Sequence, residues 1–192
     1  ANVDAILDAG GIASINHPNY QWAFDHESIR HVNRANLLEI YNGHPVANVY
    51  GGTGKFSYEE IWDGVLTADK LIFGVATDDA HNYHDFEPKM SNPGRGWVVV
   101  QSTELTVEAI LGGLTSGAFY SSTGVTLSEL EILPHSIRLT IQEEMRHLYT
   151  TRFTGRDGTL LSETNGLEAE YSLKGDEGYV RATVTSSGNT KA

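Results

Sequence analysis

Cysteine is absent from this 192-residue sequence, which excludes disulfide bonds, Cys-ligated zinc, iron–sulfur clusters and thiol nucleophiles, and leaves the redox compartment undetermined. Any metal ion must therefore bind to His, Asp or Glu. Basic residues are also scarce: 13 Lys and Arg stand against 25 Asp and Glu, a formal net charge of −12. Without a basic stripe, nucleic acid is not an expected partner. No run approaches about 18 apolar residues, so no membrane segment is expected.

The length permits one large domain or two small ones, and the sequence pattern changes near Gly124. Before that point, helical spacing and capping residues predict helices at residues 2–9, 25–33, 57–70 and 106–117. Apolar runs predict strands at residues 11–18, 35–43, 71–77 and 96–102. Repeated alternation of strand and helix indicates parallel βα units, an α/β domain over residues 1–124. In such folds the chemistry gathers at the carboxyl ends of the strands.

After Gly124, apolar and polar residues alternate in short segments separated by turn residues. Strands are predicted at residues 127–133, 136–142, 148–155, 166–175 and 179–187. This spacing predicts a small antiparallel β-sandwich over residues 125–192. The period of two predicts a set of inward-facing apolar side chains: Leu130, Ile132, Leu139, Ile141, Phe153, Leu173 and Val180.

Polar clusters follow the predicted strands of the first domain. In an extended segment, residues two apart share a face, so Asp79 and His81 should point into one pocket and Asp78 away from it. His17 precedes Pro18, which favours an extended backbone at His17. Imidazole and carboxylate groups suit zinc, manganese or iron. Together these strand ends predict a metal site, although each cluster alone could be a turn or a helix cap.

Four other residues near these strand ends have more than one interpretation. Glu39 is a candidate general base or simply a charge at a strand end. Arg95 is a candidate ligand for an anionic substrate, since a guanidinium pairs well with phosphate or carboxylate, or a solvated loop residue. Asn42 and His44 are interpreted as turn and surface residues, although His44 repeats the His-Pro pairing of His17.

Four segments in this order resemble the PHP superfamily of metal-dependent hydrolases, in particular its CehA/McbA-type branch: GGIASINHP, LLEIYNG, GVATDDAH and the segment from GWVVVQS to GAFYSSTG. The resemblance implies a partial, distorted (β/α)7 barrel followed by a small β-domain. It also implies divalent metal ions, Zn, Mn or Fe, up to three in a complete family site. His17 matches the His-Pro motif, and Asp79 and His81 match the closing Asp-x-His motif, so these three are the implied metal ligands.

The resemblance further implies hydrolysis of phosphoesters or of carboxylic or carbamate esters by metal-activated water, with Glu39 and Arg95 as candidate catalytic residues. The family's opening His-x-His motif is not found, so the chain is expected to be a poorly active portion that needs an upstream half or self-association. A small-molecule substrate is the expected partner. The alternative is a non-catalytic binding or assembly module, whose β-domain would recognise carbohydrate or protein through Tyr149, Tyr171 and Tyr179.

Overall fold

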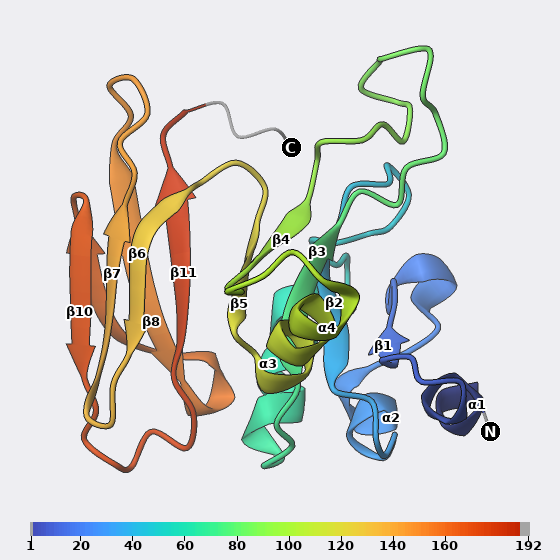
Figure 1. Cartoon of the computed structure of the whole chain (residues 1–192), viewed down its shortest axis with the longest axis horizontal. Coiled ribbons are helices and arrows are strands. Elements are labelled where there is room, and N and C mark those ends of the chain that lie inside the picture. The colour runs from blue at the N-terminus through green and yellow to red at the C-terminus, as the bar shows by residue number, and fades with distance from the viewer. Residues whose placement is uncertain (1, 189–192) are drawn as a thin grey trace. The chain divides into compact units, whose positions relative to one another are not determined.

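The computed structural model describes residues 2–188, and the chain divides into two compact units, Ala1–Thr123 and Gly124–Ala192 (Figure 1). Ala1 and residues 189–192, the outer ends of the two predicted domains, lie outside the described residues. Within residues 2–188, no helix combines the length and the apolar character that crossing a bilayer requires.

The first unit holds the helices α1 (Asn2–Asp8), α2 (His26–Arg30), α3 (Tyr58–Thr67) and α4 (Val107–Ser116), and the strands β1 (Ser14–Ile15), β2 (Leu37–Asn42), β3 (Phe73–Thr77), β4 (Trp97–Val100) and β5 (Phe119–Ser122). The second unit holds β6 (Leu127–Ile132), β7 (Ser136–Ile141), β8 (Tyr149–Gly155), β9 (Thr159–Asn165), β10 (Glu168–Ser172) and β11 (Arg181–Ser186). Short 3₁₀ turns occupy Tyr20–Trp22 and Arg156–Gly158.

A three-stranded parallel sheet in the order β1-β2-β3 forms the centre of the first unit. Its apolar side chains pack against α2 and α3 in one core, whose fully buried members are Ile29, Leu38, Ile61, Val65 and Ile72. Because all three strands run the same way, their carboxyl ends meet at one edge of the sheet. The segments that follow the strands therefore lie close together there.

The predicted partial (β/α)7 barrel is wrong. Among residues 2–188, only β1, β2 and β3 are parallel, and most of the regular structure is strand in small separate sheets. The predicted fourth barrel strand, β4, pairs antiparallel with β5 in a two-stranded sheet, with Trp97 opposite Ser122. It does not extend the parallel ladder.

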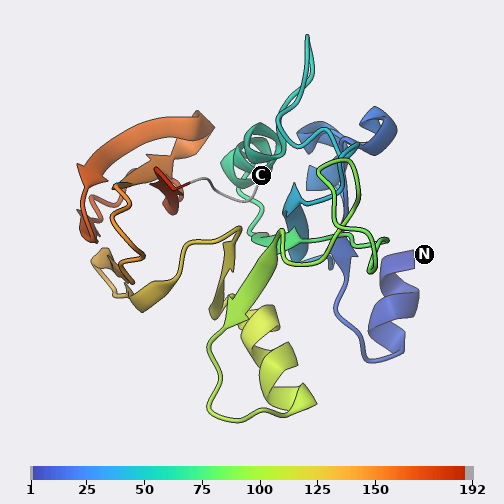
Figure 2. The same cartoon turned by 90° about the horizontal axis from the view of Figure 1, so that it is seen from above.

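The connection between β4 and β5 explains this difference. Gln101, just after β4, donates its backbone N–H to Ala118, just before β5, at 2.9 Å. Six residues, 101–106, can span at most about 20 Å, which is enough to run along the length of about 15 Å expected for ten-residue α4. The loop and helix therefore bring the chain back to the strand end it left, so α4 is an insertion in a hairpin (Figure 2). A parallel crossover would instead return the chain to the other end of β4, where that strand begins.

Local capping signals set the helix boundaries. The Ser57 side chain accepts from the Glu60 backbone N–H, and the Glu60 carboxylate accepts from the Ser57 backbone N–H, a complete capping box at α3. Asp25 caps α2, and Thr106 caps α4. Gly117 ends α4 with a left-handed φ of 78°, a conformation in which a Cβ would collide with the Phe73 ring.

The second unit contains two three-stranded antiparallel sheets, in the orders β10-β7-β6 and β11-β8-β9 (Figure 1). Both sheets contribute to one core, whose buried members are Leu139, Ile141, Tyr149, Phe153, Ala169 and Tyr171. Of the predicted inward-facing residues, Leu130, Leu173 and Val180 pack against this core while partly buried. Ile132 is 73% exposed, because it is the last residue of the edge strand β6.

Candidate functional site

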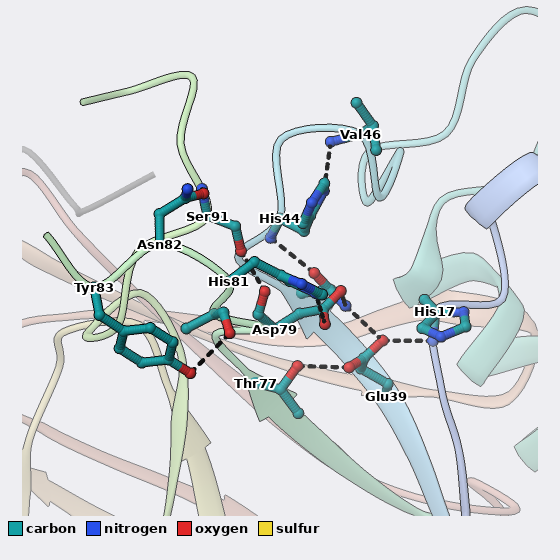
Figure 3. Close-up of polar contacts among 12 residues, drawn as sticks. His17, Glu39, His44, Val46, Thr77, Asp79, His81, Asn82, Tyr83 and Ser91 are labelled. Carbon is teal, nitrogen blue, oxygen red and sulfur yellow. Dashed lines mark hydrogen bonds and ion pairs between the residues drawn. The ribbon is translucent and has the colours of Figure 1, made fainter. Parts of the chain in front are cut away.

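A pocket of about 320 Å³ lies at the carboxyl edge of the parallel sheet. Each of the three strands supplies lining residues from the segment that follows it: His17 after β1, His44 after β2, and Asp79 and His81 after β3 (Figure 3). The remaining lining residues are Tyr20, Val46 and Ala47. The structure thus brings the three predicted metal ligands, His17, Asp79 and His81, to one pocket.

Glu39 lies beneath the pocket and does not line it. Its side chain is 2% exposed, and the carboxylate accepts three hydrogen bonds from three different segments. The donors are the backbone N–H of His17 at 2.5 Å, the side-chain amide of Asn42 at 3.0 Å and the hydroxyl of Thr77 at 2.5 Å. The predicted general base therefore joins the ends of β1, β2 and β3 from below.

Asn42 connects this buried carboxylate to the pocket. Its side-chain amide also donates to Oδ2 of Asp79 at 3.2 Å, and the other carboxylate oxygen of Asp79 lies 3.1 Å from Nε2 of His81. Ser91 donates its hydroxyl to the backbone carbonyl of Asp79. Asn42, interpreted from sequence as a turn residue, is a buried amide that orients Asp79.

The surroundings of Asp79 favour its ionised form. Burial alone would raise the pKa of its carboxyl group, but the hydrogen bonds from Asn42 and His81 and the electrostatic influence of the nearby His81 and His44 rings outweigh burial and lower the pKa below its ordinary value. Asp79 is therefore a carboxylate at neutral pH, which is the form that can accept a proton or bind a cation.

The backbone at the site differs from the extended segments predicted. His17 has a φ of 35° and Asp79 a φ of 47°, so both adopt left-handed conformations that are uncommon outside glycine. The prediction that Pro18 holds His17 extended is wrong. Asp78 does turn away from the pocket: its carboxylate accepts from the backbone N–H groups of Arg95 and Gly96.

Arg95 does not line the pocket. Its guanidinium donates to the backbone carbonyls of Gly43 at 2.9 Å and Glu87 at 3.0 Å, and to the side-chain oxygen of Asn92 at 3.2 Å. A Cβ at Gly43 would lie 2.7 Å from the Arg95 side chain, so glycine permits this crossing. Arg95 therefore ties the loop after β3 to the turn after β2.

His44 is the pocket residue that sequence reasoning assigned to the surface. It is half-buried, and its ring meets the ring of His81 edge to face, with centroids 5.5 Å apart. The signal that could have found it was its position directly after β2, at the same strand-end level as His17 and Asp79. The repeated His-Pro pairing pointed the same way.

The pocket fits a divalent metal ion in the type of its donors, since imidazole and carboxylate suit zinc or manganese. The number of suitably arranged ligands, however, is too small. Within residues 2–188, no three or more His, Asp or Glu side chains are arranged as a set that would hold an ion. Asp79 and His81, which contact each other, are the best-placed pair of ligands, and His17 lines the same pocket.

Comparison with protein-family models, with curated proteins and with solved structures finds no match for this chain.

Proposed function

We propose that the chain is a metal-dependent hydrolase that acts on esters. The observation that carries this proposal is the convergence of His17, Asp79 and His81 on one pocket from the ends of β1 and β3. An ionised Asp79 beside an imidazole supports cation binding. A bound divalent ion would supply a Lewis acid and a water molecule of lowered pKa.

The remaining residues would orient these groups. Glu39 and Asn42 hold His17 and Asp79 through buried hydrogen bonds, and the Arg95 guanidinium holds the loop that carries His81. A preorganised site of this kind needs little rearrangement when a substrate binds. Glu39 and Arg95 act in this proposal as positioning residues.

The pocket favours carboxylic or carbamate esters over phosphoesters as the substrate class. None of its lining residues is Lys or Arg, and the guanidinium of Arg95, which lies outside the pocket, donates to Gly43, Glu87 and Asn92. A phosphoryl dianion would therefore find no Lys or Arg among the lining residues, and it would face the carboxylate of Asp79. Tyr20 and Val46 offer an apolar side to the bound molecule.

Calorimetric titration with zinc and manganese tests the proposal. Because the described ligands number fewer than the usual three per ion, we expect weak binding by the 192-residue chain and slow hydrolysis of an aryl ester. Asp79→Asn and His81→Ala should weaken metal binding at least about tenfold, a loss of one good ligand interaction. His135→Ala, at an exposed histidine of the second unit, is the matched control and should change nothing. Equal metal affinity in His81→Ala and the parent chain would refute the proposal.

The alternative function, a binding module that uses aromatic residues of the β-domain, has little support from the second unit. Tyr149 and Tyr171 are each 5% exposed and belong to the core. The Tyr171 hydroxyl donates to the buried carboxylate of Glu177, and the Tyr149 hydroxyl accepts from the Glu144 backbone. These two rings pack the core and are not available as a recognition surface. The third candidate, Tyr179, is half-buried, and its hydroxyl accepts from the Gly158 backbone N–H at 3.4 Å.

A further inference from the structure

His44 is held by two successive turns in which a side chain accepts a backbone N–H two residues ahead. In the first, the side-chain oxygen of Asn42 accepts from the His44 N–H at 2.7 Å. In the second, Nδ1 of His44 accepts from the Val46 N–H at 3.3 Å. Both have the geometry of an Asx-turn, with the His44 ring in the place of an Asn amide in the second. The ring is thereby held from its backbone and from one of its nitrogens.

The hydrogen bond to Val46 assigns the proton of the neutral ring. A nitrogen that accepts from a backbone N–H cannot carry a hydrogen of its own, so the proton lies on Nε2. A proton on Nδ1 would place two donors face to face. Nε2 is therefore a hydrogen-bond donor, which makes His44 unsuited to ligate a metal ion through that atom.

The N–H at Nε2 of His44 needs an oxygen atom as its hydrogen-bond acceptor in the pocket. His44 lines the same 320 Å³ space as Asp79 and His81, and its ring touches that of His81. The Asn42 side chain connects His44 to Asp79, because it accepts from the His44 backbone N–H and donates to the Asp79 carboxylate. The donor on His44 is thus held at a constant position relative to the candidate metal ligands.

We propose that His44 donates a hydrogen bond from Nε2 to a carbonyl or carboxylate oxygen of the molecule bound in this pocket. The proposal rests on the proposed function for the identity of that molecule, an ester or its carboxylate product, but the donor itself follows from the hydrogen bond to Val46. In an ester hydrolase, a fixed donor of this kind stabilises the negative charge that develops on the carbonyl oxygen.

Two substitutions separate the two nitrogens of the ring. In His44→Asn the amide oxygen can take the place of Nδ1 and complete a true Asx-turn with the Val46 N–H, but no donor reaches the position of Nε2. In His44→Gln the longer side chain can bring an amide N–H close to the position of Nε2, but the acceptor for Val46 is lost. Thermal melting of both variants checks that the first unit remains folded.

Binding of benzoate in the presence of zinc, measured by calorimetry, is the first readout. Loss of a hydrogen bond to a charged group should weaken benzoate binding about tenfold or more in His44→Asn, while His44→Gln should stay within about threefold of the parent chain. Zinc affinity should be unchanged in His44→Asn. Benzoate binding equal to that of the parent chain in a folded His44→Asn variant would overturn the proposal.

The second readout is the tautomer of His44 in the parent chain without metal, from ¹⁵N chemical shifts of the imidazole ring at pH 8.5. A proton on Nε2 is expected, and a proton on Nδ1 would overturn the proposal. These results are separate from the test of the hydrolase. If zinc does not bind and no ester is cleaved, the proposed function fails, while the tautomer and benzoate binding without zinc still decide the role of His44.

Discussion

Substitution of Glu39 distinguishes a positioning role for this carboxylate from the catalytic role that its strand-end location predicted. Glu39→Leu removes the acceptor of three donors: the His17 N–H, the Asn42 amide and the Thr77 hydroxyl. An unsatisfied buried donor costs about 1–3 kcal/mol. Asn42 is fully buried, whereas water can reach His17 and Thr77 more readily. We therefore expect the free energy of unfolding of the first unit to fall by about 3–5 kcal/mol.

Glu39→Gln is the matched control because it keeps the shape of the side chain. Its amide oxygen can still accept from His17 and Asn42, and its NH₂ group can donate to the Thr77 hydroxyl. Neutral hydrogen bonds are roughly half as strong as those to a carboxylate, so the expected loss is smaller, about 1–2 kcal/mol.

Tryptophan fluorescence during urea unfolding measures these losses selectively. The sequence contains three tryptophans, Trp22, Trp62 and Trp97, and all three belong to the first unit. The signal therefore reports on the unit that contains Glu39. A loss below about 1 kcal/mol for Glu39→Leu would refute the positioning argument. A Glu39→Gln variant with unchanged stability and zinc affinity but without esterase activity would restore the general base of the sequence-based hypothesis.

Two other predictions concern the loop after β3 and the second unit. Arg95→Ala should lower the free energy of unfolding of the first unit by about 2 kcal/mol, since three hydrogen bonds of a guanidinium are lost. Arg95→Lys should recover only part of that stability. Tryptophan fluorescence during urea unfolding measures both variants, and changes within about 0.5 kcal/mol would contradict this role. Backbone N–H groups, that of Lys174 above all, lower the pKa of Glu177 from 4.5 to about 2. A lowered carboxyl pKa stabilises the fold above the unfolded value and loses this contribution as pH falls. The melting temperature of the second unit, followed by circular dichroism, should thus drop between about pH 4.5 and pH 2, and Glu177→Gln should flatten the drop; an equal drop in that variant would refute the assignment.

The sequence predicted the features that depend on neighbouring residues. The capping box of Ser57 and Glu60 and the cap at Thr106 set helix starts where the structure has them, because a cap is satisfied within three residues. The segments predicted as strands in the second unit each contain an observed strand. The strand β9 escaped prediction, since its residues Thr159–Asn165 are mostly polar and partly exposed and alternate weakly.

Strand pairing could not be predicted from the same signals. The apolar run at Trp97–Val100 is compatible with a parallel or an antiparallel neighbour. The direction of β5 depends on where loop 101–106 and α4 return the chain, and they return it beside the end of β4, where Gln101 donates its backbone N–H to Ala118. An alternation of strand and helix therefore predicted a barrel where the chain forms a hairpin with a helical insertion. The family resemblance reinforced the error, because it assigned β4 to the barrel.

The convergence of the candidate residues on one edge of the sheet was easier to predict than the fold around it, and the structure gives a physical reason. A site at the carboxyl edge requires only that β1, β2 and β3 run parallel, which the three apolar runs and their connecting helices achieve without a closed barrel. The positions of His17 and Asp79 were predicted, but their left-handed backbone was not, since sequence rules assign such conformations mainly to glycine. Residues hold such conformations where surrounding hydrogen bonds over-determine them. Here the carboxylate of Glu39 holds the His17 N–H, and Asn42 and Ser91 hold the side chain and the carbonyl of Asp79. The polar network beneath the pocket thus sets the geometry of the site, and its contacts join residues between 12 and 37 positions apart that no local pattern could have linked.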